Sequence, residues 1–152
     1  MQRVLKTTYD SNGQPRQIPV MRDLYTYTAG FTGASVLAAG ASLTDIINFE
    51  SDSDFIWTKS TFVAYDAAVT SNGNKNVAIT VSINDSGTGR NLQQEPTPIT
   101  SMAGTGSLPF ILPQARTIKG NSTVQFVFTN FSAADTYQYC YLTLHGFKEW
   151  RV

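Results

Sequence analysis

The chain has 152 residues, and its 41% hydrophobic content is enough for one domain with a core of its own. Only 14% of the residues are charged, and eleven basic residues balance eleven acidic ones, so the basic surface typical of nucleic-acid-binding and membrane-surface proteins is missing. The single cysteine, Cys140, excludes an intramolecular disulfide. A neutral surface rich in Ser, Thr, Asn and Gln favours a protein that packs among other subunits, because few charges need to be desolvated there.

Residues 1–23 are expected to form an extended N-terminal arm. Asn12-Gly13 is typical of a turn, and Pro15 and Pro19 interrupt any helix. Two interpretations remain open, a flexible terminus or an arm that lies on a neighbouring subunit. In the second interpretation, basic and apolar side chains of the arm contact the partner, namely Arg3, Arg16, Ile18, Val20 and Arg22.

Residues 24–152 are expected to form one β domain of about eight strands. Each candidate strand is rich in aromatic and β-branched residues and is bounded by turn-forming residues. The candidates are residues 24–29, 42–50, 55–65, 77–84, 99–102, 110–112, 123–131 and 137–150. Because no window longer than a turn or two has helical period, the pattern predicts an all-β fold, an antiparallel jelly-roll-like sandwich.

The clearest alternation lies in residues 77–84 and 123–128. Apolar side chains occupy every second position there and are expected to face the interior. They are Val77, Ile79, Val81, Ile83, Val124, Phe126 and Phe128. Residues 71–74, Ser-Asn-Gly-Asn, predict a turn before the first of these strands.

No catalytic residue is expected. His145 is the only histidine, and no motif around it supplies a nucleophile or an orienting acid, so it is interpreted as a packed or interface side chain. Alternation places it on one face with Tyr141 and Thr143. Cys140 falls on the opposite face, where a small buried hydrophobe belongs. The sequence therefore favours a protein that is not an enzyme.

No metal or cofactor site is expected either. Glu50, Asp52 and Asp54 place carboxylates at alternate positions, and calcium binds clustered oxygens. The glycine and the distal Glu of an EF-hand loop are missing, so a solvated acidic turn is favoured. The glycine pairs that flank Thr88 and Thr105 lack the continuation of a phosphate-binding loop.

Tyr137, Tyr139 and Tyr141 stand at alternate positions and predict a stripe of tyrosines on one face. Such a stripe is more often core or subunit interface, because tyrosine combines a large apolar area with a polar tip. These three residues are therefore further candidates for partner contact. A carbohydrate-binding platform is the alternative, whereas the basic residues of a nucleic-acid platform are missing.

With these residues in view, the chain resembles the small virion proteins of tailed bacteriophages, of the capsid decoration (cement) type. The resemblance covers about residues 45–151 and is an order of short blocks. The blocks are Asp52-Ser-Asp-Phe-Ile-Trp57, Asn84-Asp-Ser-Gly-Thr-Gly-Arg90, Ile99-Thr-Ser-Met102, Gly106-Ser-Leu-Pro-Phe-Ile-Leu-Pro113, Gly120-Asn-Ser-Thr123, Phe128-Thr-Asn130 and Leu142-Thr-Leu-His-Gly-Phe-Lys148. In that family a Gly-Arg before a loop, a Leu-Pro-Phe segment and a terminal Gly-Phe-Lys close a jelly-roll-like fold.

The resemblance implies a non-enzymatic virion protein without an active site, assembled in the cytoplasm of the bacterial host. Its implied partners are the major capsid protein or other virion subunits and copies of itself in a homotrimer, with neither nucleic acid nor membrane among them. A collar, connector or tail-attached protein is the alternative within this class. A carbohydrate-binding β-sandwich module is the alternative from another class.

Overall fold

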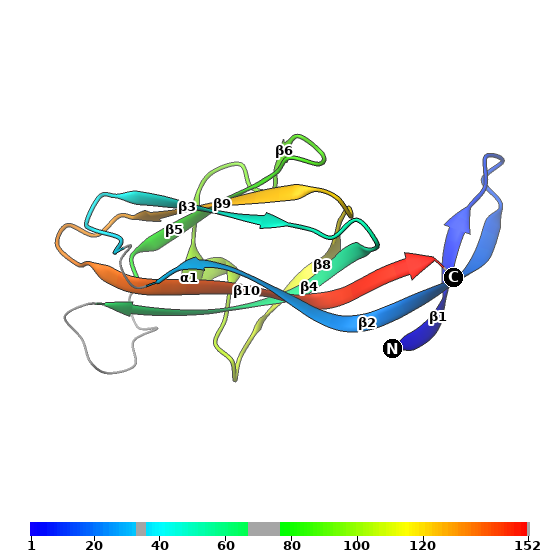
Figure 1. The fold of residues 1–152 in the computed structure, drawn as a ribbon, viewed down its shortest axis with the longest axis horizontal. Coiled ribbons are helices and arrows are strands. Elements are labelled where there is room, and N and C mark those ends of the chain that lie inside the picture. Colours follow the sequence, from blue (N-terminus) through cyan, green and yellow to red (C-terminus); the bar gives the residue numbers. More distant parts are fainter. Residues whose placement is uncertain (33–35, 67–76, 152) are drawn as a thin grey trace.

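The computed structural model describes residues 1–32, 36–66 and 77–151, and the turn expected at residues 71–74 lies outside these ranges. The described residues form two antiparallel sheets packed face to face (Figure 1). Sheet A has the strand order β1-β2-β10-β4-β8, and sheet B has the order β3-β9-β5-β6, with β7 also paired to β5. The elements are β1 (Gln2–Tyr9), β2 (Pro15–Phe31), β3 (Ser42–Asn48), β4 (Asp54–Asp66), β5 (Ile79–Asp85), β6 (Arg90–Asn91), β7 (Thr97–Pro98), α1 (Ile99–Met102), β8 (Phe110–Ile118), β9 (Thr123–Asn130) and β10 (Tyr137–Arg151).

The strand order is that of a jelly roll. Counted from β2, and with β6 and β7 taken as one strand, the sandwich has eight strands. In sheet A, the neighbours β2, β10, β4 and β8 are then the first, eighth, third and sixth. Sheet B then holds the second, seventh, fourth and fifth, so the chain alternates between the sheets as two Greek keys do. The expected all-β, antiparallel, jelly-roll-like sandwich is confirmed, with ten strands among the described residues instead of about eight.

The core lies between the two sheets and is filled by alternate side chains. The side chains of β5 alternate between buried and half-buried along the whole strand. All seven residues expected to face the interior are at most 5% exposed, so this prediction is confirmed. Cys140, Leu142 and Leu144 of β10 are fully buried on the sheet A side of the core, as the alternation predicted.

Two short segments differ from the prediction. Residues 99–102 form α1, a single helical turn, because Ile99 and Met102 also fit a helical spacing and four residues are too few to define a period. The strand expected at residues 110–112 continues through Pro113 to Ile118 as β8. A proline is tolerated there because β8 is an edge strand. No helix in the described ranges is long and apolar enough to span a membrane.

The N-terminal segment forms a β-hairpin, which the sequence analysis did not predict. β1 pairs antiparallel with the first half of β2, from Gln2 opposite Arg22 to Tyr9 opposite Pro15. β2 continues without a break to Phe31 and pairs with β10 over its second half. The boundary expected between residues 23 and 24 therefore falls inside one strand. Figure 1 shows that the hairpin projects past the end of the sandwich.

The buried aromatic side chains of β9 offer a test of the core. Phe126 has no exposed surface, so Phe126→Ala leaves a cavity and is expected to lower the free energy of unfolding by about 3–5 kcal/mol. Gln125→Ala, one position away and exposed, is the matched control and should change it little. Urea denaturation of both variants measures the difference, and a loss below about 1 kcal/mol for Phe126→Ala would contradict the packing.

Candidate functional site

The candidate site is the projecting hairpin, whose two faces differ. In β1 the side chains of Val4, Lys6 and Thr8 are half-buried and share one face, on which Lys6 contacts Glu149. The odd-numbered side chains point to the opposite face. They are Arg3, Leu5, Thr7 and Tyr9, and all four are exposed, Leu5 by 67% and Tyr9 by 72%. The hairpin thus holds one face against the protein and leaves the other free.

Glu149 of β10 holds the hairpin to the sandwich. Its side chain is only 5% exposed and forms ion pairs with Lys6 of β1 and with Arg22 of β2. The Arg22 Nε donates a hydrogen bond of 2.8 Å to the Glu149 Oε2. Burial alone would raise the pKa of Glu149, but the hydrogen bonds from Lys6 and Arg22 outweigh it and hold that pKa below its ordinary value. The two ends of the chain are therefore joined by a buried carboxylate.

A second ion pair extends this charged row across sheet A. Glu149 lies opposite Asp54 of β4, and two carboxylates at such a position repel each other. Asp54 accepts hydrogen bonds from the Lys119 Nζ at 2.7 Å and from the Gly120 amide at 3.1 Å. Burial would raise the pKa of Asp54, and these partners lower it. Glu149 is thus paired with Lys6 and Arg22, and Asp54 with Lys119, which offsets the repulsion between the two carboxylates.

The five hairpin residues expected to contact a partner fall into two groups. Arg3 and Arg16 are exposed and Ile18 is half-buried, so all three remain accessible. Val20 is 2% exposed, and the Arg22 guanidinium is bound to Glu149. The chain uses both side chains internally to seat the hairpin, so Val20 is not accessible to a partner in this structure, and partner contact by the half-buried Arg22 stays a prediction.

The predicted tyrosine stripe is interrupted. The pairing of β10 with β4 shifts by one residue between Tyr137 and Tyr139, so these two side chains point to opposite faces. Tyr137 is 3% exposed, and its hydroxyl accepts a hydrogen bond of 2.7 Å from the Ala78 amide. Tyr139 packs against Tyr65 and Tyr141 with ring centroids 4.5 and 5.8 Å apart. Tyr137 is therefore not accessible to a partner in this structure, whereas Tyr139 and Tyr141 are half-buried on the outer face of sheet A, and their contact role stays a prediction.

His145 and Cys140 lie on opposite faces of β10. The His145 Nε2 is 2.8 Å from the Thr61 Oγ1, and burial, assisted by the charge of Lys59, lowers the pKa of His145. Burial raises the pKa of Cys140 to about 12, which keeps this thiol protonated at neutral pH. Cys140 is therefore a packed core side chain, whereas His145 is half-buried on the outer face of sheet A.

The three acidic residues at alternate positions do not converge on one point. Glu50 forms an ion pair with Lys148, and Asp54 pairs with Lys119. The Asp52 carboxylate accepts a hydrogen bond from the neighbouring Ser53 hydroxyl. Within residues 1–32, 36–66 and 77–151 no group of three His, Cys, Asp or Glu side chains is arranged to hold a metal ion.

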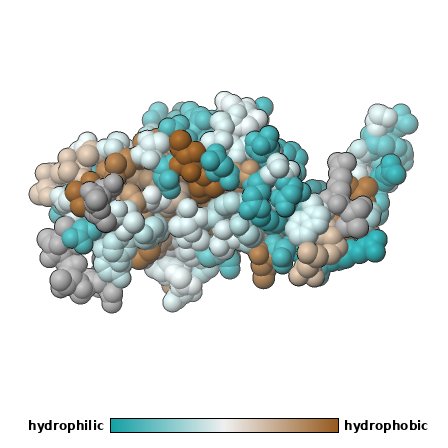
Figure 2. All heavy atoms as spheres, viewed as in Figure 1, coloured by the Kyte–Doolittle hydropathy of each residue, from teal (hydrophilic) through white to brown (hydrophobic). Residues whose placement is uncertain are grey.

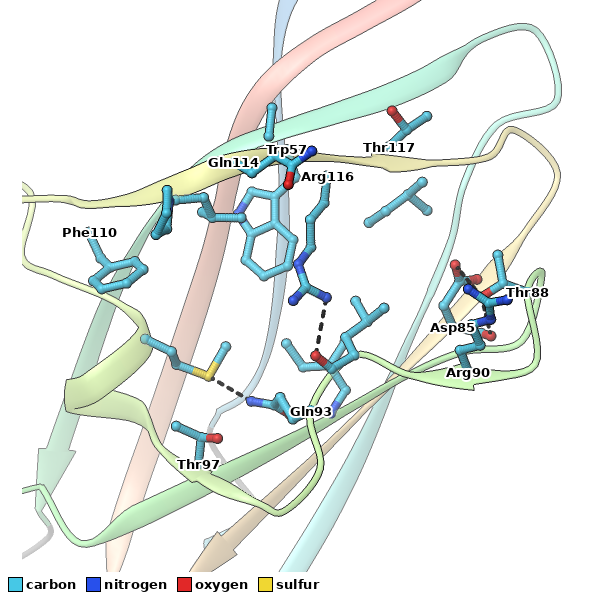
Figure 3. A pocket seen from close by; sticks show the side chains of 17 residues that line it. Trp57, Asp85, Thr88, Arg90, Gln93, Thr97, Phe110, Gln114, Arg116 and Thr117 are labelled. Carbon is cyan, nitrogen blue, oxygen red and sulfur yellow. Dashed lines mark hydrogen bonds between the residues drawn. The ribbon is translucent and has the colours of Figure 1, made fainter.

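A cleft of about 710 Å³ lies between the edges of the two sheets, next to β8 and β6. Figure 3 shows Trp57, Gln93 and Arg116 around it. The Arg116 guanidinium donates to the Leu92 carbonyl at 3.1 Å, and the Gln93 amide donates to the Met102 sulfur at 3.3 Å. These two polar groups already bond to the chain, but Asp85, Arg90 and Gln114 also line the cleft, so its walls are both apolar and polar. Sequence reasoning missed it, since its walls come from segments far apart in the sequence, from Trp57 to Ile118.

No protein-family model matches this chain, and no curated protein is similar to it.

The ion pairs of Glu149 predict a measurable contribution to stability. Glu149→Gln removes the buried charge and leaves Lys6 and Arg22 without a carboxylate, so the free energy of unfolding should fall by about 1.5–3 kcal/mol. Glu95→Gln, at an exposed position, is the matched control and should change it little. Equal effects of the two variants in urea denaturation would contradict the anchoring role.

The lowered pKa of Glu149 predicts the pH dependence of this contribution. A carboxylate whose pKa falls on folding stabilises the folded state above its ordinary pKa, here 4.5, and loses that contribution as the pH falls through the lowered value. The stability difference between the wild type and Glu149→Gln should therefore be constant near neutral pH and shrink below pH 4.5. A difference that grows on acidification would have the wrong sign.

Proposed function

We propose that this protein is a non-enzymatic structural protein of a bacteriophage virion, a decoration protein that binds the outside of the capsid. Its partners are the major capsid protein or neighbouring virion subunits and further copies of itself, in the homotrimer that the family resemblance implies. It is assembled in the cytoplasm of the bacterial host and remains in the particle. A collar, connector or tail-attached protein is the alternative within the same class.

The observation that supports this proposal best is the projecting hairpin. It is paired along its whole length and tied to β10 by Glu149, so it is already ordered before any partner binds. An ordered element loses less chain entropy on binding than a disordered arm does, which leaves more of the contact energy for affinity. Its free face offers both charge and apolar area, from Arg3, Leu5 and Tyr9. These are the properties of a docking element.

The jelly roll is compatible with this function without selecting it. The fold occurs in viral capsid proteins and also in lectins, and function has to be argued from sites. A decoration protein acts by contact, since each copy buries area between neighbouring shell subunits. Many interfaces of the order of 1,000 Å² each add up to a shell that resists internal pressure better.

The abundance of the protein in purified particles tests the proposal directly. A decoration protein is expected in hundreds of copies per virion, and a collar protein in about a dozen, because the two sites have different symmetry. Quantitative mass spectrometry of phage particles that encode this chain measures the number. Its absence from the particles would refute the virion assignment.

Charge reversal on the hairpin tests the docking role. Arg3→Glu and Arg16→Glu alter exposed side chains, so the fold should persist while affinity for particles falls at least tenfold, about 1.4 kcal/mol. Arg90→Glu, which alters an exposed arginine of β6, is the matched control. Sedimentation of labelled protein with particles measures the affinities. If the three variants bind alike, the hairpin arginines are not part of the interface.

Carbohydrate binding is a second candidate, favoured by the packing of Tyr65, Tyr139 and Tyr141 on the outer face of sheet A. Clustered aromatic rings with exposed hydroxyls suit a sugar that offers both apolar and polar surface. A glycan array tests this reading. Glycan binding that Tyr139→Ala abolishes would favour it over the structural role.

A further inference from the structure

The edges of the two sheets differ in how accessible they are to another strand. In sheet A, four residues of β8, 112–115, face one residue of β4, so this edge is bulged. In sheet B, β6 and β7 have two residues each, and β3 is bridged to sheet A by a hydrogen bond of 2.8 Å from the Gly30 amide to Asp45. Among the described residues, β1 is the longest edge strand that keeps an unbroken register. It has eight residues in unbroken register and no proline.

The hydrogen bonding of the hairpin shows which backbone groups of β1 are free. At the turn, the Asp10 amide donates to the Gln14 carbonyl at 3.0 Å, in line with the register of the two strands. Bonded and non-bonded pairs alternate in an antiparallel ladder, so the even-numbered residues of β1 bond to β2. The amides and carbonyls that point to the free edge are those of Arg3, Leu5, Thr7 and Tyr9.

The prolines of β2 fit the same pattern. Pro15 and Pro19 lie opposite Tyr9 and Leu5, at non-bonded positions where the backbone nitrogen points away from β1. A residue without an amide hydrogen therefore costs the hairpin no hydrogen bond there. The second strand is thus protected on its outer side by two prolines, while β1 has none on its side.

The side chains of β1 select one register for pairing with an identical strand. The residues whose backbone groups point to the free edge have to lie opposite each other in the two strands. The two-fold axis therefore passes through a residue position and not between two residues. An axis at Lys6 would place two lysines directly opposite each other, which is destabilising. An axis at Leu5 places Leu5 opposite the partner's Leu5 and Arg3 opposite the partner's Thr7. It also uses residues 1–9 in full, with no like charges opposed.

We propose that two copies of this chain join edge to edge through antiparallel β1 strands around a two-fold axis at Leu5. The two A sheets, of five strands each, become one continuous sheet. Backbone hydrogen bonds supply affinity, and the exposed Leu5 side chains pack across the axis. Figure 2 shows the hairpin as a narrow extension at one end of the molecule. A two-fold contact cannot close the proposed homotrimer, so in such an assembly it joins one trimer to another. The pairing does not depend on the virion assignment, so either can fail without the other.

Two proline variants of one residue pair test the edge. Thr7 and Gln17 lie opposite each other and share a side-chain hydrogen bond of 2.7 Å, which both Thr7→Pro and Gln17→Pro remove. The amide lost from Thr7 faces the free edge of β1, and the amide lost from Gln17 faces away from β1. By analytical ultracentrifugation, Thr7→Pro should weaken dimerisation at least about tenfold, and Gln17→Pro should leave it unchanged. A monomeric wild type at micromolar concentration, or equal dimerisation of the two variants, would overturn the proposal.

Cysteine cross-linking tests the register. In the proposed pair the two Leu5 Cα atoms are about 5.5 Å apart, within the range that a disulfide spans. Leu5→Cys should therefore give a covalent dimer on mild oxidation. Tyr9→Cys, which would face the partner's Met1, should not, and the buried native Cys140 should leave the wild type monomeric on a denaturing gel. Cross-linking of Tyr9→Cys but not of Leu5→Cys, or a trimer whose Leu5→Cys chains stay unlinked, would overturn the proposal.

Discussion

The buried carboxylate of Glu149 is the constraint on which the shape of this molecule depends. It lies near the end of β10 and binds Lys6 of β1 and Arg22 of β2. It therefore fixes the hairpin at the end of the sandwich, where sheet A extends beyond sheet B (Figure 1). A buried carboxylate without partners would cost several kcal/mol, so the two cations have to stay in place. The pairing of β2 with β10 continues past residue 23 to Val20, and the ion pairs of Glu149 add to it, so the hairpin is a continuous extension of sheet A.

That constraint links the fold to the proposed functions. The sandwich buries its own apolar side chains between two sheets, and its outer surface is nearly neutral. The hairpin extends sheet A beyond this body and exposes Leu5 and Tyr9 together with an open strand edge. A pre-ordered element of this kind can pair with another strand by backbone hydrogen bonds and bind a shell surface by its side chains. Both roles need the hairpin to be rigid.

The sequence predicted the sandwich well and the hairpin poorly, for physical reasons. Strands such as β5 and β9 have one buried face, so apolar residues recur at every second position. β1 has no fully buried face, and its charged Lys6 is satisfied by Glu149, 143 residues away in the sequence. No pattern in the sequence around Lys6 indicates a contact with so distant a residue. The register shift after Tyr137 was equally invisible, because the alternation of tyrosines continues unbroken through it.

Residue-resolved amide hydrogen exchange, measured by NMR on dilute protein, tests most directly whether the hairpin is ordered. The account predicts slow exchange for the amides that bond to β2, those of Val4, Lys6 and Thr8, and fast exchange for those of Leu5 and Thr7, which face the free edge. The latter pair should slow as the protein concentration rises. Uniformly fast exchange throughout residues 2–9 would contradict the account, because it would describe a flexible tail.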